Sequence, residues 1–174
     1  MVSDDGILPL YHRMRDEIPG LAPLDAHTHI GFNDPDGYRC AREELVDALD
    51  RIDARAIVFP MQEPDGYRDP NDMVIREAEE SAGKLFPFCR LDPRDDPLTE
   101  ARRCLEAGAK GIKLHPRAER FTLSEPAVRE IVAEFADDFG YDLDEEGQPL
   151  TDEQAIREGG GRREEEREEE PAAA

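Results

Sequence analysis

The sequence predicts an α/β protein with a parallel sheet, and three observations lead to this prediction. Short apolar runs bounded by glycine or proline alternate with longer segments of helical periodicity. The run ARAIVF at residues 54–59 is almost wholly apolar, as expected of a strand buried in a sheet. The strand–helix order repeats four times before residue 140, and such repeats form parallel sheets with helical crossovers.

The four predicted strands are residues 24–30, 54–59, 84–91 and 111–115. The first begins after Pro23 and closes at Gly31, while Pro60 and Pro116 end the second and the fourth. Pro87 lies inside the third strand, where its missing N–H weakens the strand pattern.

The four predicted helices are residues 41–52, 71–82, 98–107 and 125–139. The first places apolar residues at the spacing of one buried face, namely Leu45, Val46, Leu49 and Ile52. Asn71 is a plausible N-cap of the second helix, which stops before Gly83, and Gly108 stops the third. Ser124 and Gly140 suit the two ends of the fourth helix.

The chain has 174 residues, enough for one domain with a core of its own. Four strand–helix units are half of the eight that form a (β/α)8 TIM barrel of typically about 250 residues. No fifth strand follows, because YDLDEEGQPL contains no apolar run. We therefore predict a partial TIM barrel over residues 1–140 and an acidic, disordered tail over residues 141–174.

The charge of the chain limits its partners. It has 22 Lys and Arg against 43 Asp and Glu, a net charge of −21, and 15 of the acidic residues fall in residues 136–174. Such a field disfavours nucleic acid, anionic membranes and acidic macromolecular partners. Acidic excess with few lysines is typical of a halophilic cytoplasmic protein, and an acidic mesophilic protein is the alternative.

Cysteines and hydropathy predict the compartment. Cys40, Cys89 and Cys104 are odd in number and lack metal-type spacing, which indicates free thiols in a reducing environment. The first residues lack the pattern of a secretory signal, and no apolar run approaches membrane-spanning length. We expect a soluble cytoplasmic chain.

Two histidines, His27 and His29, stand in the first predicted strand, and Asp25 precedes them. Residues two apart share one face of a strand, so we expect these three side chains to project together toward its carboxyl end. Active sites of α/β sheets form at that end. Two imidazoles there can hold one cation, and zinc suits them well. Spacing alone is equally compatible with polar surface histidines.

His115 ends the fourth predicted strand, and Lys113 shares its face by alternation. Taken alone, His115 is best interpreted as a strand-end residue that bonds the backbone. Its position, matching that of His29 on another strand, favours a functional role. The remaining histidine, His12, lies in an amphipathic N-terminal stretch and is predicted to be a surface residue.

The segment LDAHTHIG at residues 24–31 and the segment GAKGIKLHP at residues 108–116 resemble the amidohydrolase superfamily, specifically its amidohydrolase-related branch. NDMVIREAEESAGKLFPFCRLDP and RFTLSEPAVREIVAEFADDFG are similar to further parts of this family, so the resemblance spans roughly residues 20–140. It implies a metal-dependent TIM-barrel enzyme that acts on a small-molecule substrate, either a hydrolase or a non-oxidative decarboxylase.

The resemblance also implies roles for individual residues. His27 and His29 would bind a divalent metal ion, zinc by expectation, and His115 would be a further ligand or a catalytic residue in contact with substrate. Metal-bound water would then attack an amide, ester or related bond, with a carbon–carbon lyase as the alternative. Relatives carry a carbamylated lysine on the fourth strand; for Lys113, packing or ion pairing is the stronger interpretation.

The chain departs from the family pattern after residue 140. Family members continue with a strand that ends in a histidine and a later strand that ends in a metal-binding aspartate, yet no histidine follows His115. A sheet of four strands leaves edges and an apolar face exposed. We expect either a homo-oligomer or a complementing second-half chain; otherwise the chain is a truncated, non-catalytic remnant.

Overall fold

The computed structural model describes residues 4–135. The chain divides into two compact units, Met1–Phe121 and Thr122–Ala174. In the first unit, parallel strands form one sheet in the order β1-β2-β3-β4: β1 (Leu24–Ile30), β2 (Arg55–Pro60), β3 (Leu85–Arg90) and β4 (Gly111–Lys113). The predicted α/β class with a parallel sheet is confirmed. The predicted disordered tail, residues 141–174, lies outside the described residues.

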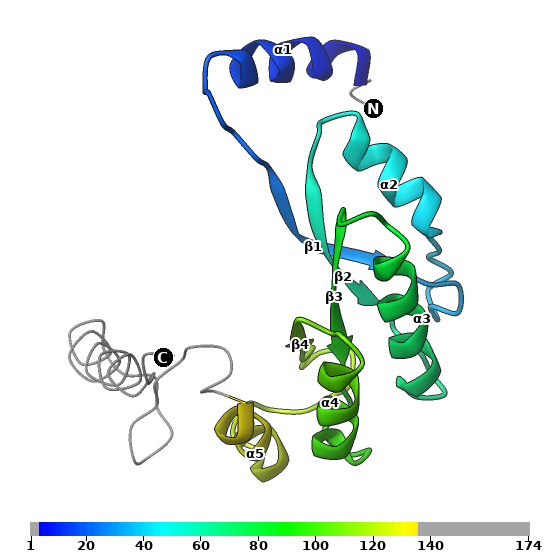
Figure 1. Ribbon diagram of the computed structural model, residues 1–174. Helices are drawn as coiled ribbons and strands as arrows, with labels where there is room; N and C mark the ends of the chain where they lie inside the picture. The colour runs from blue at the N-terminus through cyan, green and yellow to red at the C-terminus, as the bar shows by residue number, and fades with distance from the viewer. Residues whose placement is uncertain (1–3, 136–174) are drawn as a thin grey trace, which may run out of the picture. The chain divides into compact units, whose positions relative to one another are not determined.

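Helices connect the strands. The first unit contains α1 (Asp4–Asp16), α2 (Arg42–Asp50), α3 (Arg68–Glu79) and α4 (Pro97–Glu106), and the second contains α5 (Pro126–Phe135). Each of α2, α3 and α4 joins two neighbouring strands, and Figure 1 shows α2 and α3 along the same side of the sheet. Within residues 4–135, no helix is long and apolar enough to span a membrane.

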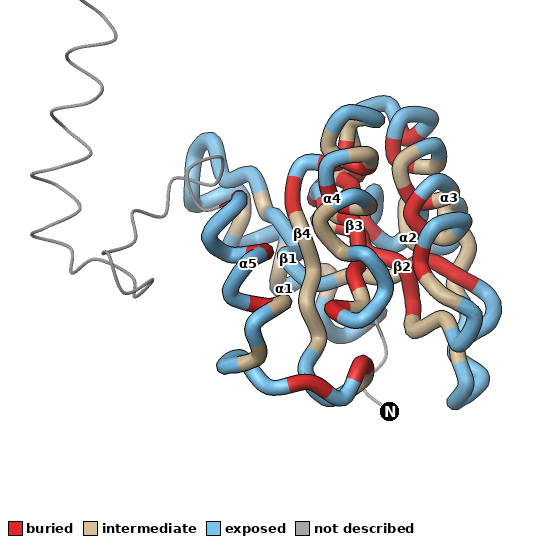
Figure 2. Tube along the Cα trace, turned by 90° about the horizontal axis from the view of Figure 1, so that it is seen from below, coloured by how far each residue is buried: buried red, intermediate tan, exposed pale blue. Residues whose placement is uncertain are grey.

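The main core lies between the sheet and these helices. Its buried side chains come from three strands and two helices and the turn before β2: Ile30, Leu49, Ala54, Ala56, Val58, Val74, Ala78 and Leu85. Leu45, Val46 and Ile52 pack against them, as the helical spacing predicts. Figure 2 shows buried residues along β2 and β3, whereas β1 is mostly exposed. The opposite face of the sheet carries aromatic residues, among them Phe59 and Phe88, whose rings pack edge-on.

Helix α3 begins at Arg68, so the prediction of Asn71 as its N-cap is wrong. Asn71 is fully buried in the first turns of the helix. Its Nδ2 donates to the carbonyl oxygen of Arg90 at 3.1 Å, and its Oδ1 accepts from the Arg90 N–H at 2.8 Å. These tertiary hydrogen bonds replace the local cap and tie α3 to the end of β3.

The third and fourth strands also differ from their predicted extents. β4 ends at Lys113, so His115 lies beyond the strand rather than at its last position. Pro87 is accommodated inside β3, where it pairs with Val58 and its carbonyl oxygen accepts from the Lys110 N–H at 2.7 Å. The remaining strand bounds agree with the predictions within two residues.

Gly111 provides a test of the β3–β4 packing. A Cβ built at this position would lie 2.4 Å from Cε2 of Phe88, whose ring packs edge-on against Phe59. Gly111→Ala is expected to lower the free energy of unfolding by about 1–3 kcal/mol, because the ring has to shift. Urea denaturation measures the change. The same substitution in a Phe88→Leu background should cost much less; an equal cost in both backgrounds would rule out the ring contact as the cause.

Candidate active site at the carboxyl ends of the strands

His27 and His29 lie together on the face of the sheet opposite the main core. Their ring centroids are 5.1 Å apart, and each ring contacts Phe59, with centroid separations of 5.5 Å and 5.4 Å. His29 pairs with Phe59 across the β1–β2 ladder, which puts both side chains on the same face. The shared face of the two histidines agrees with the alternation of the strand.

Asp25 does not share that face. The β1–β2 register shifts between Asp25 and Thr28, so that Asp25 pairs with Ala56, a residue of the main core. The irregularity reverses the alternation before His27. Asp25 instead accepts a hydrogen bond through Oδ1 from the His27 N–H at 2.9 Å. The expectation that three side chains project together is therefore wrong for Asp25, because alternation holds only in a regular strand.

The ring of His29 is fixed by the neighbouring strand. Its Nδ1 lies 3.0 Å from the carbonyl oxygen of Pro60, and because a carbonyl only accepts, Nδ1 carries the proton. Burial lowers the pKa of His29, and the charges of nearby Arg90 and Lys113 lower it further, against the raising effect of the Pro60 hydrogen bond. His29 is thus held as a neutral imidazole with Nε2 unprotonated.

Lys113 faces the two histidines from β4. Its Nζ lies 3.4 Å from Nε2 of His27 and 4.8 Å from the centroid of the Phe59 ring. Burial lowers the pKa of Lys113, and the charge of Arg90 lowers it further. The cation–π contact with Phe59 supports a packing role for this lysine, one of the two interpretations of the sequence.

His115 lies in the turn after β4, and its ring contacts the backbone. Its Nδ1 accepts a hydrogen bond from the Ala118 N–H at 3.1 Å, so a neutral ring carries its proton on Nε2. His115 and His29 line the same cavity, which has a volume of about 630 Å³. Arg90, Arg117 and Arg120 line it as well. We call this the histidine cavity.

No group of three or more His, Cys, Asp or Glu side chains in the described part of the chain is close enough to hold a metal ion. His27 and His29 are adjacent, but His115 joins only His29 in a shared cavity. The structure therefore brings together the two histidines of β1 and places His115 nearby without completing a ligand set. The three cysteines are free thiols, as the sequence predicts.

A buried ion pair stands beside the histidines, and sequence reasoning missed it. Nε and Nη2 of Arg90 donate to Oε1 of Glu119 at 3.1 Å and 2.8 Å, and both side chains are only 3% exposed. Nη1 of Arg90 donates to the carbonyl oxygen of Pro60 at 3.3 Å, and the same oxygen accepts the hydrogen bond of His29 Nδ1. In the sequence, Arg90 lies next to the end of a predicted strand and Glu119 follows another, but no local pattern links the two residues.

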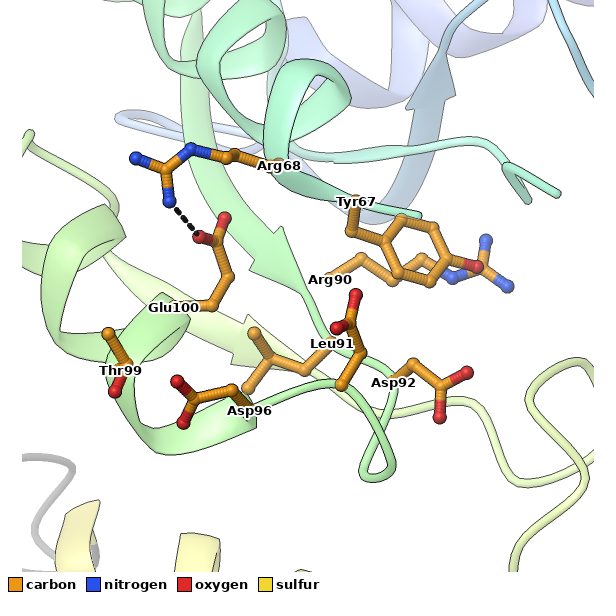
Figure 3. Close-up of a pocket in the computed structure, with 9 residues that line it drawn as sticks. Tyr67, Arg68, Arg90, Leu91, Asp92, Asp96, Thr99 and Glu100 are labelled. Carbon is orange, nitrogen blue, oxygen red and sulfur yellow. Dashed lines mark ion pairs between the residues drawn. The ribbon is translucent and has the colours of Figure 1, made fainter. Parts of the chain in front are cut away.

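Tyr67 completes this buried group. Its hydroxyl donates to Oε1 of Glu119 at 2.5 Å, and its ring lies 5.1 Å from the guanidinium carbon of Arg90. Figure 3 shows the ring over the Arg90 side chain. Burial and the bond to Glu119 raise the pKa of Tyr67 well above its ordinary value. The tyrosine therefore stays protonated and acts as a donor.

A smaller cavity of about 150 Å³ lies beside the same residues, between α3 and α4. Glu100 lines it and is paired with Arg68 at 3.7 Å (Figure 3). Nη2 of Arg103 donates to Oε1 of Glu100 at 2.7 Å, and Nδ2 of Asn71 donates to the same oxygen at 2.9 Å. Burial alone would raise the pKa of Glu100, but these hydrogen bonds outweigh it and lower the pKa to about 2.

Comparison with known protein families, with curated proteins and with solved structures finds no match to this chain.

The lowered pKa of Glu100 predicts acid sensitivity. A carboxyl group whose pKa is about 2 when folded and 4.5 in a model peptide stabilises the fold above the higher value and loses that contribution as pH falls toward the lower one. Glu100→Gln should therefore lower the free energy of unfolding at pH 7 and flatten its decline between pH 5 and pH 2. Urea denaturation across this pH range measures both effects.

Glu79, the last residue of α3, is exposed to solvent and supplies the control. Glu79→Gln changes the net charge equally without touching the Asn71 and Arg103 hydrogen bonds, so its pH profile should match that of the unmodified chain. Equal profiles for the two variants would contradict the ascribed role of Glu100.

Proposed function

We propose that the chain contributes to a metal-dependent hydrolase of the amidohydrolase-related type acting on a small molecule, and that its sheet is half of a (β/α)8 barrel. Sequential parallel strands with a helix in each crossover support this proposal. Further support comes from the clustering of histidines, lysine and arginines at the carboxyl ends of the strands, where barrel enzymes carry their active sites.

His27 and His29 would hold the metal ion, with zinc the expected element. The observation that carries this proposal is the hydrogen bond of His29 Nδ1 to the Pro60 carbonyl oxygen, at 3.0 Å. Metal-binding histidines are oriented in this manner, since the bonded nitrogen fixes the tautomer and leaves the other nitrogen free. A zinc ion held there would supply Lewis-acid chemistry, polarising a carbonyl and lowering the pKa of water.

His115 would act on the substrate rather than on the metal. Because its Nδ1 is occupied by the Ala118 N–H, its neutral ring presents Nε2–H, which donates a hydrogen bond and cannot also coordinate. That proton suits a substrate oxygen that gains negative charge during hydrolysis. Of the two roles that the sequence resemblance implied, the geometry favours substrate contact.

Metal binding is the direct test of this proposal. Zinc added to the purified chain should bind with a stoichiometry of about one per chain, since catalytic zinc sites hold one ion, and His27→Ala combined with His29→Ala should abolish that binding. Isothermal titration calorimetry and elemental analysis after dialysis give the readout without requiring a substrate.

His12 is the matched control for the double variant. It is exposed on α1 and contacts Tyr11 rather than the other histidines. His12→Ala should bind zinc as the unmodified chain does. Equal zinc binding by the double variant and the unmodified chain would overturn the assignment of His27 and His29.

A second feature of the chain supports the proposal of a partner chain. Large apolar side chains that are at least 40% exposed follow one another along α1 and into β1: Ile7, Leu10, Met14, Ile18, Leu21 and Leu24. The first four residues of β1 are exposed although they belong to a strand. An apolar surface beside an open strand edge is typical of an interface.

We propose a second copy as the partner, because two copies of this apolar stripe would cover each other in a symmetric antiparallel pairing of α1. Multi-angle light scattering should give twice the chain mass, and Leu10→Glu with Met14→Glu should give the single mass. A monomer that binds zinc stably would contradict this proposal and leave the metal assignment standing.

A further inference from the structure

Lys113 reaches the histidines of β1 from the far edge of the sheet. Its Nζ lies 3.4 Å from Nε2 of His27 and 4.8 Å from the centroid of the Phe59 ring. The same ring packs edge-on against His27, with the two centroids 5.5 Å apart. Because the three residues belong to β4, β1 and β2, this contact joins three strands of the sheet.

The contact with Lys113 decides which nitrogen of His27 carries the proton. An ammonium group has three N–H donors and no acceptor, so Nε2 of His27 accepts from Lys113 and the proton of the neutral ring lies on Nδ1. His29 has the same tautomer, because its Nδ1 donates to the Pro60 carbonyl oxygen. Both rings therefore carry their lone pair on Nε2, and Lys113 occupies the lone pair of His27.

Lys113 lacks the usual partner of a lysine. No carboxylate among residues 4–135 forms an ion pair with it, whereas Lys84 pairs with Asp50 at 2.7 Å. In a chain with 43 acidic and 22 basic residues, a lysine without a carboxylate is unexpected. Its ammonium group is held instead by an imidazole lone pair and an aromatic ring, two groups that attract cations. The histidine pair is thus a cation site that holds a cation of the chain itself.

A metal ion would compete with this internal cation. Nε2 of His27 has one lone pair, so it can accept from Lys113 or bind a metal ion, but not both at once. The charge of Lys113 also acts on His29, and it would repel a divalent ion bound at that ring. A metal ion therefore requires that the lysine side chain move away from the ring of His27.

We propose that Lys113 is an internal competitor of the metal ion: its ammonium group occupies the metal-binding nitrogen of His27 in the metal-free chain, and the ion displaces it. Lys113 thereby sets the affinity of the site and holds the ring of His27 in the required tautomer before the ion arrives. This inference rests on the proposed function, because it concerns the metal ion that His27 and His29 would hold.

The zinc affinity of a Lys113→Leu variant is the first test. Leucine keeps an apolar contact with Phe59 and has no donor, so the variant should bind zinc about tenfold more tightly than the unmodified chain, the factor expected when one hydrogen bond from a charged group no longer has to be broken. Lys110→Leu is the matched control, because Lys110 is exposed and the change in net charge is equal. It should bind zinc as the unmodified chain does. Isothermal titration calorimetry measures the three affinities.

The gain in affinity should depend on His27. In a His27→Ala background, Lys113→Leu should no longer strengthen zinc binding, because the nitrogen for which the two cations compete is missing. An equal gain with and without His27 would contradict competition at this ring.

Lysine NMR signals follow the displacement directly in the unmodified chain. The chain has three lysines, Lys84, Lys110 and Lys113, so carbon-13 labelling at lysine Cε gives one signal for each. The signal of Lys113 should be shifted from the other two by the ring current of Phe59, which its ammonium group contacts. Zinc should move this signal toward that of the exposed Lys110. A Lys113 signal that stays in place while zinc binds would overturn the inference.

The outcomes separate this inference from the proposed function. Zinc binding of equal strength in the unmodified chain and in Lys113→Leu would reject the competition and retain the metal site. Zinc binding to neither chain would reject the metal site and the competition with it. Zinc binding to Lys113→Leu alone would support the competition, because the site would then open only when the lysine is removed.

Discussion

The buried ion pair between Arg90 and Glu119 is the constraint on which the rest of the site depends. Two opposite charges that are each 3% exposed tolerate the loss of neither partner, because an unpaired charge in the interior costs several kcal/mol. Arg90 ends β3 and Glu119 lies in the loop after β4, so the pair fixes that loop on the sheet. Tyr67, at the start of α3, is held to the same carboxylate. The Glu119 carboxylate thus links three parts of the fold: the end of β3, the loop after β4 and the start of α3.

The geometry of the histidines follows from this arrangement. The Pro60 carbonyl oxygen accepts hydrogen bonds from both Arg90 and His29, so the orientation of the His29 ring is coupled to that of the ion pair. Asn71 bonds both backbone groups of Arg90 and thereby fixes the end of β3 from the helix side. The positive charge of Arg90 also helps keep the His29 ring neutral. A rigid, neutral imidazole is what a metal site on a strand requires.

Periodicity and turn residues were sufficient to predict the parallel sheet, the helix that follows each strand and the shared face of His27 and His29, because these follow from local patterns; helix α1 was not among the predicted helices. The departures have long-range causes. Asn71 was expected at a helix cap, but hydrogen bonds to Arg90 bury it within α3. Asp25 was expected beside the histidines, but the register shift against β2 turns it to the other face. The Arg90–Glu119 pair joins residues 29 positions apart and has no local signature.

The distribution of charge in the histidine cavity bears on how so acidic a chain can select a ligand. A net charge of −21 repels anions at long range and attracts cations to the whole surface. Screening by salt removes most of this attraction beyond about 10 Å, so selectivity must come from sites where charge and shape coincide. The histidine cavity combines the two, because three arginines (Arg90, Arg117 and Arg120) and two aspartates (Asp34 and Asp36) line it beside His29 and His115. A ligand bound there meets charges of both signs within one cavity, so the arrangement of these side chains, rather than the net charge of the chain, would set its orientation.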